Sequence, residues 1–280
     1  METRPLPVST TSDGAVPPDA VPVGDRPEPD FVQSFAKGLA VIESFGPDSA
    51  AQTLSDVARR TGTSRAAARR LLHTLVAMGF AETDGRLFRL RPRVLNLGFA
   101  YLHAQGIWTV AQPFMVELVE KIHESCSAAV LDGDEIVYVA RVPTRQRIMS
   151  VSLGIGSRLP AHVTSMGRVL LAGLPDADLE ASIARAQPLP RRTPSTLVDA
   201  EALRREILAV RGRGWCAVDQ EMEPGLRSIA VPVKDAAGRT VAALNVGTHA
   251  GRASVEALVE RILPALKDTA SAISRAIGAR

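Results

Sequence analysis

The chain has 280 residues, of which 46% are apolar and 22% are charged, and its net charge is +3. This composition excludes an intrinsically disordered chain, and without a run of 18 apolar residues we expect no membrane span. The two cysteines, Cys126 and Cys216, lack the spacing of a disulfide framework or a zinc site, so we expect no metal and a reducing cytoplasm.

Residues 1–30 are rich in Pro, Asp, Ser and Thr and lack the apolar stretch of a signal peptide, so we predict a disordered tail. From Phe31 onward, apolar residues recur at three- and four-residue spacing. This spacing predicts an amphipathic helix that ends at Gly46 and Pro47. The apolar stripe consists of Phe35, Leu39, Ile42 and Phe45.

Two further helices are predicted next, separated by a tight turn at Gly62. Thr53 is placed to cap a helix over Leu54–Arg60, and Ser64 is placed to cap a longer helix. The inward positions are Leu54, Val57 and Ala58 in the first helix, and Ala68, Leu71, Leu72 and Leu75 in the second. The order of short helix, glycine turn and longer helix is typical of a helix-turn-helix.

A hairpin follows over Phe80–Leu90, because Asp84-Gly85 supplies the positive φ of a two-residue turn. Three helices and this hairpin predict a winged helix-turn-helix. Between Thr53 and Arg93 there are nine arginines and three acids, which gives this segment a charge of +6. The arginines are residues 59, 60, 65, 69, 70, 86, 89, 91 and 93. A basic patch on a small domain indicates a polyanion partner.

The start of the longer helix is expected to meet base edges in the DNA major groove. Arg65 and Arg69 share a face, and an arginine bonds guanine O6 and N7 together, so these two are the specificity candidates. Arg70 is expected to meet phosphates, and Arg86 the backbone or minor groove. The candidate DNA-binding residues are Thr53, Ser64, Arg65, Ala67, Arg69, Arg70 and Arg86.

An arginine-rich helix face taken alone is more often a solvated surface than a DNA reader. Here the two capped helices, the glycine turn and the basic hairpin occur in order, and this combination favours DNA binding.

From Arg93 the composition becomes apolar, which predicts a linker helix over residues 93–106 and then a helix over Ile107–His123. The predicted strands are Ser127–Leu131, Ile136–Arg141, Ile148–Leu153, Cys216–Asp219, Arg227–Val233 and Val241–Val246. The other predicted helices are Thr164–Ala172, Asp176–Ala184, Asp199–Arg213 and Ser254–Ile277. Strands in hairpins with helices before and after them predict an α+β domain with an antiparallel sheet.

Two of these strands indicate a small-molecule pocket. Ile229, Val231 and Val233 occupy one face of their strand, and Ser228 and Ala230 the other. In the last strand, Leu244 and Val246 alternate with Ala243 and Asn245. If the two strands pair, small and polar residues share a face and leave room there. The Asn245 side chain needs a hydrogen-bond partner, which is either a ligand or the backbone and water.

Three other groups are candidates for ligand contacts. The helix that begins at Thr164 presents free N–H groups and a dipole that suit a carboxylate, although simple capping by Thr164 also explains the residue. Asp219 and Glu221 lie at a strand end, where they are placed to accept hydrogen bonds from a ligand hydroxyl. Arginines 141, 145 and 147 cluster near another strand, facing an anion or solvent.

The second half of the chain carries no catalytic signature, since it lacks the GxSxG, HExxH and phosphate-binding glycine motifs. Its histidines are scattered, and hairpin chemistry explains Asp132 and Asp134 better than acid–base catalysis does. We therefore expect no catalytic residues and no cofactor.

The chain resembles the IclR family of transcriptional regulators in five segments taken together: TLSDVARRTGTSRAAARRLLHTL, FRLRPRVLNLGFAYL, RLPAHVTSMGRVLLA, GWCAVDQEMEPGLRSIAVPV and AALNVGTHAGR. The resemblance runs from Phe31 to the last helix. The segment DGDEIVYVARVPTRQRIMSVSLGIGSRLPAHVTSMGRVLL is further similar to the subgroup that controls aromatic-acid breakdown through the β-ketoadipate pathway.

This resemblance implies a GAF-like effector domain, and a dimer or tetramer that pairs through the DNA-binding halves. The implied and candidate effector-binding residues are Thr164, Ser165, Met166, Asp219, Glu221, Ser228, Asn245 and Gly247. Relatives that bind small keto acids commonly have serines at positions 245 and 247 and a cysteine at 228. The departures here favour a bulkier ligand such as protocatechuate or 4-hydroxybenzoate.

The sequence thus predicts an α+β protein with a winged helix-turn-helix over residues 31–92, a linker helix over 93–106 and an effector-binding domain over 107–280. We expect a cytoplasmic, nucleoid-associated regulator whose partners are a double-stranded DNA operator, a small carboxylate, a second copy of itself and RNA polymerase. The alternatives are a regulator that responds to an aliphatic keto acid, a ligand-independent DNA-binding protein, and an enzyme with a nucleic-acid-binding appendage.

Overall fold

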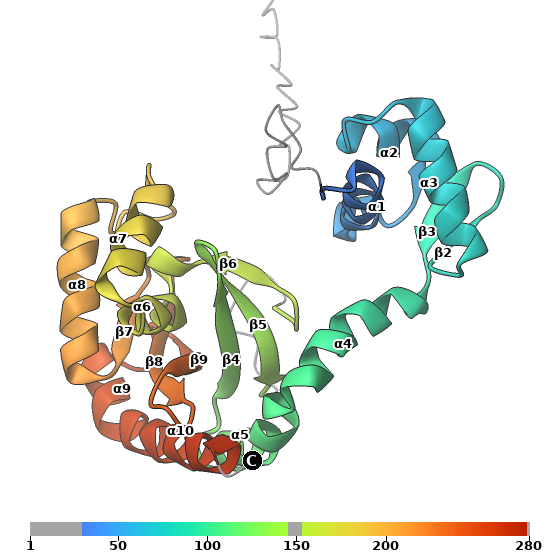
Figure 1. The fold of residues 1–280 in the computed structure, drawn as a ribbon. Coiled ribbons are helices and arrows are strands. Elements are labelled where there is room, and N and C mark those ends of the chain that lie inside the picture. Colours follow the sequence, from blue (N-terminus) through green and yellow to red (C-terminus); the bar gives the residue numbers. More distant parts are fainter. Residues whose placement is uncertain (1–29, 145–152, 279–280) are drawn as a thin grey trace, which may run out of the picture. The chain divides into compact units, whose positions relative to one another are not determined.

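The computed structural model describes residues 30–144 and 153–278, with only the backbone of residues 103–105. The chain divides into two compact units with a boundary between Tyr101 and Leu102 (Figure 1). Residues 1–29 of the predicted disordered tail lie outside the described part of the chain.

The first unit consists of three helices and a small antiparallel sheet, which confirms the winged helix-turn-helix. Its elements are α1 (Gln33–Glu43), η1 (Pro47–Ser49), β1 (Gln52–Thr53), α2 (Leu54–Arg60), α3 (Arg65–Ala77), β2 (Ala81–Thr83), β3 (Leu87–Leu90) and η2 (Pro92–Val94). The strand order is β1-β3-β2. Helix α4 (Leu95–Gln105) follows and contains the boundary between the units.

The core of the first unit forms where α1, α2 and α3 meet the sheet. Its buried residues are Val41, Val57, Ala58, Ala68, Leu72, Leu75, Ala81 and Phe88. The burial of α1 differs from the predicted apolar stripe. Val41 is fully buried, whereas Phe35 and Leu39 of the predicted stripe are 67% and 42% exposed. The small core covers only the C-terminal part of α1, so the apolar start of the helix stays uncovered in the chain.

The hairpin of the first unit exists, but its predicted two-residue turn is wrong. Residues 84–86 form a three-residue loop, in which only Gly85 has a positive φ, of 93°. Asp84 stays at negative φ because its carboxylate accepts the backbone N–H groups of Arg86 at 2.9 Å and Leu87 at 2.7 Å. This local hydrogen bonding favours the longer loop.

The second unit is a six-stranded antiparallel sheet with helices on both faces, as predicted (Figure 1). Its helices are α5 (Ile107–Ile122), α6 (Ser165–Ala172), α7 (Asp176–Arg185), α8 (Ala200–Arg213), α9 (Val255–Arg261) and α10 (Leu263–Gly278). Its strands are β4 (Ser125–Asp132), β5 (Glu135–Val142), β6 (Arg158–Pro160), β7 (Cys216–Asp219), β8 (Leu226–Lys234) and β9 (Thr240–His249). The strand order is β6-β5-β4-β9-β8-β7.

Two apolar cores separate the faces of this sheet. Helices α5, α9 and α10 pack on the face that carries Ile229, Val231 and Val233, and α6, α7 and α8 pack on the other face. Ala230 and Ala243 lie in the second core. The predicted alternation in β8 and β9 is therefore confirmed, and the small residues do share one face.

Three features of this unit differ from the prediction or lie beyond it. The single helix predicted over Ser254–Ile277 is two helices, since Pro264 cannot donate a backbone hydrogen bond and disfavours helical geometry before it. Strand β6 was not predicted. Residues 148–152 of the predicted strand Ile148–Leu153 lie outside the described part of the chain.

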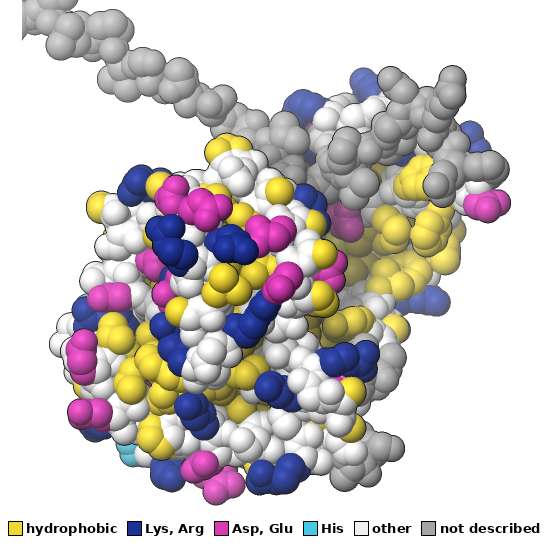
Figure 2. Space-filling view, turned by 60° about the vertical axis from the view of Figure 1, so that its left-hand side comes forward, with side chains coloured by type: hydrophobic (Ala, Val, Ile, Leu, Met, Phe, Trp, Pro, Cys, Tyr) yellow, Lys and Arg dark blue, Asp and Glu magenta, His cyan; other side chains and the backbone are white. Residues whose placement is uncertain are grey.

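Ion pairs tie together the outer helices of the second unit. Arg204 of α8 binds Glu180 of α7, and Arg211 binds Asp176. On the face shown in Figure 2, basic and acidic side chains are interspersed. That face therefore lacks the continuous positive surface that binds a polyanion. Among the described residues, no helix is both long enough and apolar enough to cross a membrane.

Candidate functional site

The two helices of the helix-turn-helix are fixed by caps at the predicted residues. Thr53 and Asp56 form a capping box, in which Thr53 Oγ1 accepts the Asp56 backbone N–H and the Asp56 carboxylate accepts the Thr53 backbone N–H, both at 3.2 Å. The Thr53 hydroxyl also donates to Asp56 Oδ2 at 2.6 Å, and this bond, together with the one from the Thr53 backbone N–H, lowers the pKa of Asp56. Ser64 Oγ accepts the Ala67 backbone N–H at the start of α3. Thr53 and Ser64 thus orient the helices.

The outward face of α3 carries the predicted arginines. Ala68, Leu72 and Leu75 bury the inner face, whereas Arg65, Arg69 and Arg70 are exposed. Within the described residues, none of these arginines forms an ion pair. The guanidinium groups at the N-terminal end of α3 are therefore available to an anionic partner.

The hairpin loop carries a further unpaired arginine. Arg89 pairs with Asp84 and Arg91 with Glu82, while the exposed Arg86 has no carboxylate partner in the described part of the chain. The Asp84 carboxylate fixes the loop, and backbone hydrogen bonds from Leu87 and Arg86 lower its pKa. Arg86 consequently extends from a fixed loop.

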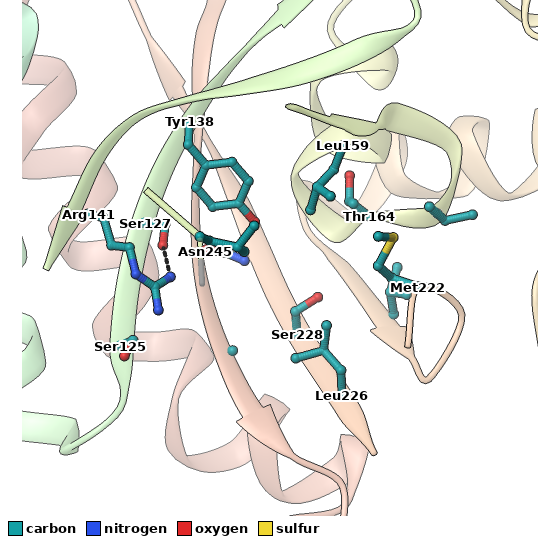
Figure 3. A pocket seen from close by; sticks show the side chains of 14 residues that line it. Ser125, Ser127, Tyr138, Arg141, Leu159, Thr164, Met222, Leu226, Ser228 and Asn245 are labelled. Carbon is teal, nitrogen blue, oxygen red and sulfur yellow. Dashed lines mark hydrogen bonds between the residues drawn. The ribbon is translucent and has the colours of Figure 1, made fainter. Parts of the chain in front are cut away.

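The second unit holds a cavity of about 60 Å³ on the polar face of its sheet (Figure 3). Its described lining combines a polar side with an apolar wall. The polar residues are Ser125, Ser127, Tyr138, Arg141, Thr164, Ser228 and Asn245. The other residues are Leu153, Leu159, Val163, Val218, Met222, Leu226 and Gly247. The structure therefore brings together Thr164, Ser228, Asn245 and Gly247, four of the predicted ligand-binding residues.

Arg141 is the one charged residue in the described lining of this cavity. It lies opposite Ser127 in the pairing of β5 with β4, and its Nη1 donates to Ser127 Oγ at 3.1 Å. Next to this pair, burial raises the pKa of Tyr138 to about 12, so its hydroxyl stays neutral at physiological pH. A cation, a neutral hydroxyl and a short serine line the same side of the cavity.

Ser228 and Asn245 lie on neighbouring strands across the cavity floor. Ser228 pairs with Gly247, and Asn245 pairs with Ala230, in the β8–β9 register. The buried Ser165 Oγ donates to Ser228 Oγ at 2.8 Å. The Asn245 amide makes no hydrogen bond within the described part of the chain. The side chain is half-buried and lines the cavity, so a ligand there can supply a hydrogen-bond partner.

The start of α6 contributes less than predicted. Thr164 lines the cavity and caps the helix by accepting the Gly167 backbone N–H at 3.0 Å. Ser165 reaches the cavity only through Ser228. Met166 is fully buried in the core beneath α6 and does not line the cavity. The helical spacing that places Met166 one residue after Ser165 turns its side chain into the core.

Asp219 and Glu221 do not line the cavity in the described structure, because both carboxylates are held by arginines. Arg227 donates to Asp219 at 2.6 and 3.0 Å, and this hydrogen bonding lowers the pKa of Asp219. Arg168, which is 3% exposed, donates to both oxygens of Glu221 at 2.8 and 2.6 Å. In the described structure both carboxylates thus have arginine partners, and their role as acceptors of a ligand hydroxyl stays a prediction.

Three polar lining residues were missed from the sequence, namely Ser125, Ser127 and Tyr138. The alternation in β4 that places both serines on one face is the signal that was available for them. Tyr138 and Arg141 are three residues apart and would face opposite ways in a regular strand. The β4–β5 register skips Val139, and this irregularity turns both side chains to the cavity. Arginines 145 and 147 lie outside the described residues.

Two families match the two units. Residues 34–85 match the family described as the IclR helix-turn-helix domain, and residues 99–275 match the one described as bacterial transcriptional regulator IclR C-terminal. The chain is 48% identical over 239 residues to the Pca regulon regulatory protein of Pseudomonas putida, covering 85% of this chain and 82% of that protein. It is 39% identical over 246 residues to the p-hydroxybenzoate hydroxylase transcriptional activator of Acinetobacter baylyi, with coverages of 86% and 90%.

A solved structure agrees with these relatives. The crystal structure of an IclR homolog from Microbacterium hydrocarbonoxydans, complexed with 4-hydroxybenzoate, matches with a TM-score of 0.78 and 29% identity, covering 88% of this chain and 100% of that chain. The chain therefore belongs to the IclR family, and it is a ligand-responsive, DNA-binding transcriptional regulator rather than an enzyme.

Proposed function

We propose that the chain controls genes of aromatic-acid catabolism by binding a hydroxylated aromatic carboxylate in the cavity of its second unit. The observation that carries this proposal is the placement of Arg141 as the one charge in the described lining, opposite an apolar wall. A guanidinium binds a carboxylate through paired, charge-assisted hydrogen bonds, and an apolar wall accommodates the ring. Arg141 then anchors the carboxylate with Ser127 beside it.

The rest of the lining suits a hydroxylated ring. Asn245 and Ser228 offer hydrogen bonds to a ring hydroxyl, and the neutral Tyr138 hydroxyl is able to donate or accept one. At Gly247 an added Cβ would come no nearer than 3.9 Å to another heavy atom, so the glycine leaves space unfilled. The Pca and p-hydroxybenzoate regulators among the relatives, and the 4-hydroxybenzoate complex, support the same ligand class.

The cavity volume favours a second candidate, a small aliphatic keto acid. The cavity measures about 60 Å³, whereas an engineered cavity of about 150 Å³ accommodates benzene. An aromatic acid therefore requires lining side chains to move, and a keto acid does not. The arginine anchor serves either acid, so the size and polarity of the remaining wall decide between them.

On DNA, we infer that α3 enters the major groove with Arg65 and Arg69 at base edges, while Arg70 and Arg86 contact the sugar–phosphate backbone. The start of α1 and the surface of α4 expose large apolar side chains that suit a second copy of the chain. These side chains are Phe31, Val32, Phe35, Leu39, Leu95, Leu97, Phe99 and Tyr101. A dimer formed there presents two α3 helices to half-sites separated by about 34–36 Å or a multiple of it.

Regulation follows from the acid preferring one placement of the DNA-binding halves. Such a preference changes operator affinity or contact with RNA polymerase, and only by as much as the acid distinguishes the two arrangements. The proposal places the chain in the bacterial cytoplasm, on the nucleoid.

Calorimetry of the full chain against a panel of acids tests the effector. We expect 4-hydroxybenzoate and protocatechuate to bind more tightly than pyruvate and glyoxylate, because only the aromatic acids use the apolar wall. Tight binding of the keto acids alone would establish the second candidate and refute the aromatic effector.

A further inference from the structure

The loop between β7 and β8, residues 220–225, forms part of the apolar wall of the cavity through Met222 (Figure 3). Most of the wall belongs to regular elements, since Leu159 lies in β6 and Val218 in β7. Val163 lies in the 3₁₀ helix η3 (Ala161–Val163) and is fully buried. Leu153 and Met222 are thus wall residues that lie outside helices and strands, and both are half-buried.

The backbone on either side of Met222 is nevertheless held in place. Glu221 is bound through both carboxylate oxygens by the buried Arg168, and Glu221 Oε2 also accepts the Leu197 backbone N–H at 2.9 Å. Arg168 in turn donates to the His162 carbonyl at 2.8 Å. Breaking a buried pair of this kind is costly, because it leaves a charge without a partner.

Hydroxyl groups from a separate segment fix the carbonyls of the same loop. Thr193 Oγ1 donates to the Gln220 carbonyl and Thr196 Oγ1 donates to the Glu221 carbonyl, each at 2.7 Å. The loop is closed by the Gln220 backbone N–H on the Leu226 carbonyl at 2.8 Å and by the Gly225 N–H on Gln220 Oε1 at 3.0 Å. The loop therefore resists backbone displacement on ligand entry.

Because the backbone of this loop is held, we expect its part of the wall to move by side-chain rotation. Methionine is unbranched, has three rotatable side-chain bonds and fills irregular gaps, whereas the valines of the same wall have stiff side chains. A cavity of about 60 Å³ has to grow before it admits a six-membered ring. We expect rotation of the Met222 side chain to enlarge the cavity. The distance that this side chain can move along the wall then limits the size of the ligand.

We propose that Met222 is the specificity-determining residue for ligand size, so that its side chain admits one aromatic ring and excludes two fused rings. This inference rests on the proposed aromatic effector. Arg141 and Ser127 bind the carboxylate at one side of the cavity. On the opposite side, Met222 limits the length of the ring system that fits. The charge of the ligand and its size are thus recognised by different residues, which lie on different strands and loops.

The test compares two acids that share their functional groups and differ by one ring, 4-hydroxybenzoate and 6-hydroxy-2-naphthoate, titrated calorimetrically into the full-length protein. We expect the parent to prefer the one-ring acid, and Met222→Ala to strengthen naphthoate binding by about tenfold or more, the usual effect of pocket carbons. Met78→Ala makes the same change at an exposed methionine outside the cavity and is the matched control, in which the parent preference stays. Thermal unfolding of each variant verifies the fold.

The two ways of failing are distinguishable. If Met222→Ala binds 4-hydroxybenzoate but gains nothing for the naphthoate, or gains equally for both acids, Met222 does not set ligand size, while the aromatic effector stands. If neither the parent nor any variant binds either acid, the aromatic effector and the size filter are both overturned.

Discussion

At the scale of single residues, the arginines of α3 and of the hairpin loop carry charge that no carboxylate of the described residues neutralises. Arg65, Arg69, Arg70 and Arg86 are exposed and lack ion pairs within the described residues, whereas Arg89 and Arg91 are held by carboxylates. They lack carboxylate partners in the described structure because they lie on the outer face of a capped helix and at the tip of a loop. A duplex that approaches this surface meets unneutralised charge.

We expect Arg65→Ala to cost about 1–3 kcal/mol of binding free energy on the preferred operator and to relax sequence choice. Arg86→Ala should weaken binding to all duplexes to a similar degree, because a backbone contact carries no sequence information. Fluorescence anisotropy with operator and scrambled duplexes measures both effects. Arg204→Ala in α8 is the control. Equal losses on the two duplexes for Arg65→Ala would remove its assignment to a base edge.

His162 makes the second unit sensitive to mild acid. The side chain is 4% exposed, and its Nε2 has no partner among the described residues. Burial lowers the pKa of His162 below its ordinary 6.5, although a hydrogen bond with the Pro190 backbone and the charge of Glu221 oppose the shift; the nearby Arg168 and Arg192 add to it. The folded chain therefore keeps this imidazole neutral where an unfolded chain protonates it.

The pKa of His162 is lower in the folded than in the unfolded chain. Its contribution to the unfolding free energy is therefore fully present above about pH 6.5 and decreases as the pH falls below that value. We expect the unfolding free energy of the second unit to lose up to about 1.4 kcal/mol per pH unit through this group. Urea unfolding followed by tryptophan fluorescence reports on this unit, since Trp108 and Trp215 both lie in it. His162→Gln should flatten the slope between pH 6.5 and 5.5. The exposed His73→Gln is the control, and an unchanged slope in His162→Gln would contradict the prediction.

The sequence predicted those candidate residues whose position follows from local rules of helix and strand structure. Thr164, Ser228, Asn245 and Gly247 line the cavity because capping and strand alternation are local rules. Asp219 and Glu221 lie outside the cavity lining: the partner of Asp219, Arg227, lies opposite it on strand β8, whereas the partner of Glu221, Arg168, is 53 residues earlier in the chain. No local pattern identifies such a partner.

At the scale of elements, caps and turn glycines fixed the helices within a residue or two, as at Thr53 and Ser64. The misses have local physical causes. Pro264 divides the last helix, the Asp84 carboxylate builds a longer hairpin loop, and the skipped Val139 rotates Tyr138 and Arg141 onto one face. A register irregularity is set by pairing between strands, so strict alternation along one strand does not predict it.

The exposed start of α1 also belongs to this scale. Val32, Phe35 and Leu39 follow one another at spacings of three and four residues, so they share a helix face, and all three are exposed in the chain. In the proposed dimer we expect a second copy to bury them, which adds hydrophobic stabilisation to this unit.

We expect Phe35→Glu to raise the dimer dissociation constant by about tenfold or more, because it places a charge in an apolar contact. Sedimentation equilibrium of the full chain measures this constant. Gln33→Glu adds the same charge on the other side of α1 and should leave association unchanged. If both variants associate like the parent, the dimer contact lies elsewhere.

At the scale of the whole molecule, one helix, α4, contains the boundary between the DNA-binding unit and the effector unit. In the proposed regulation, an acid bound at Arg141 alters the free energy of DNA binding by the other unit. A coupling of this kind is reciprocal, so operator DNA must change the affinity for the acid by the same factor. An acid that binds equally well to both arrangements of the DNA-binding halves does not change operator affinity.

The most direct measurement is operator affinity with and without 4-hydroxybenzoate for the parent and for Arg141→Ala. Footprinting upstream of the chain's own gene and neighbouring operons supplies the operator. We predict that the acid shifts the parent's affinity by about fivefold or more. Arg141→Ala should bind the operator like the acid-free parent and ignore the acid. An Arg141→Ala variant that responds to the acid as the parent does would contradict the account.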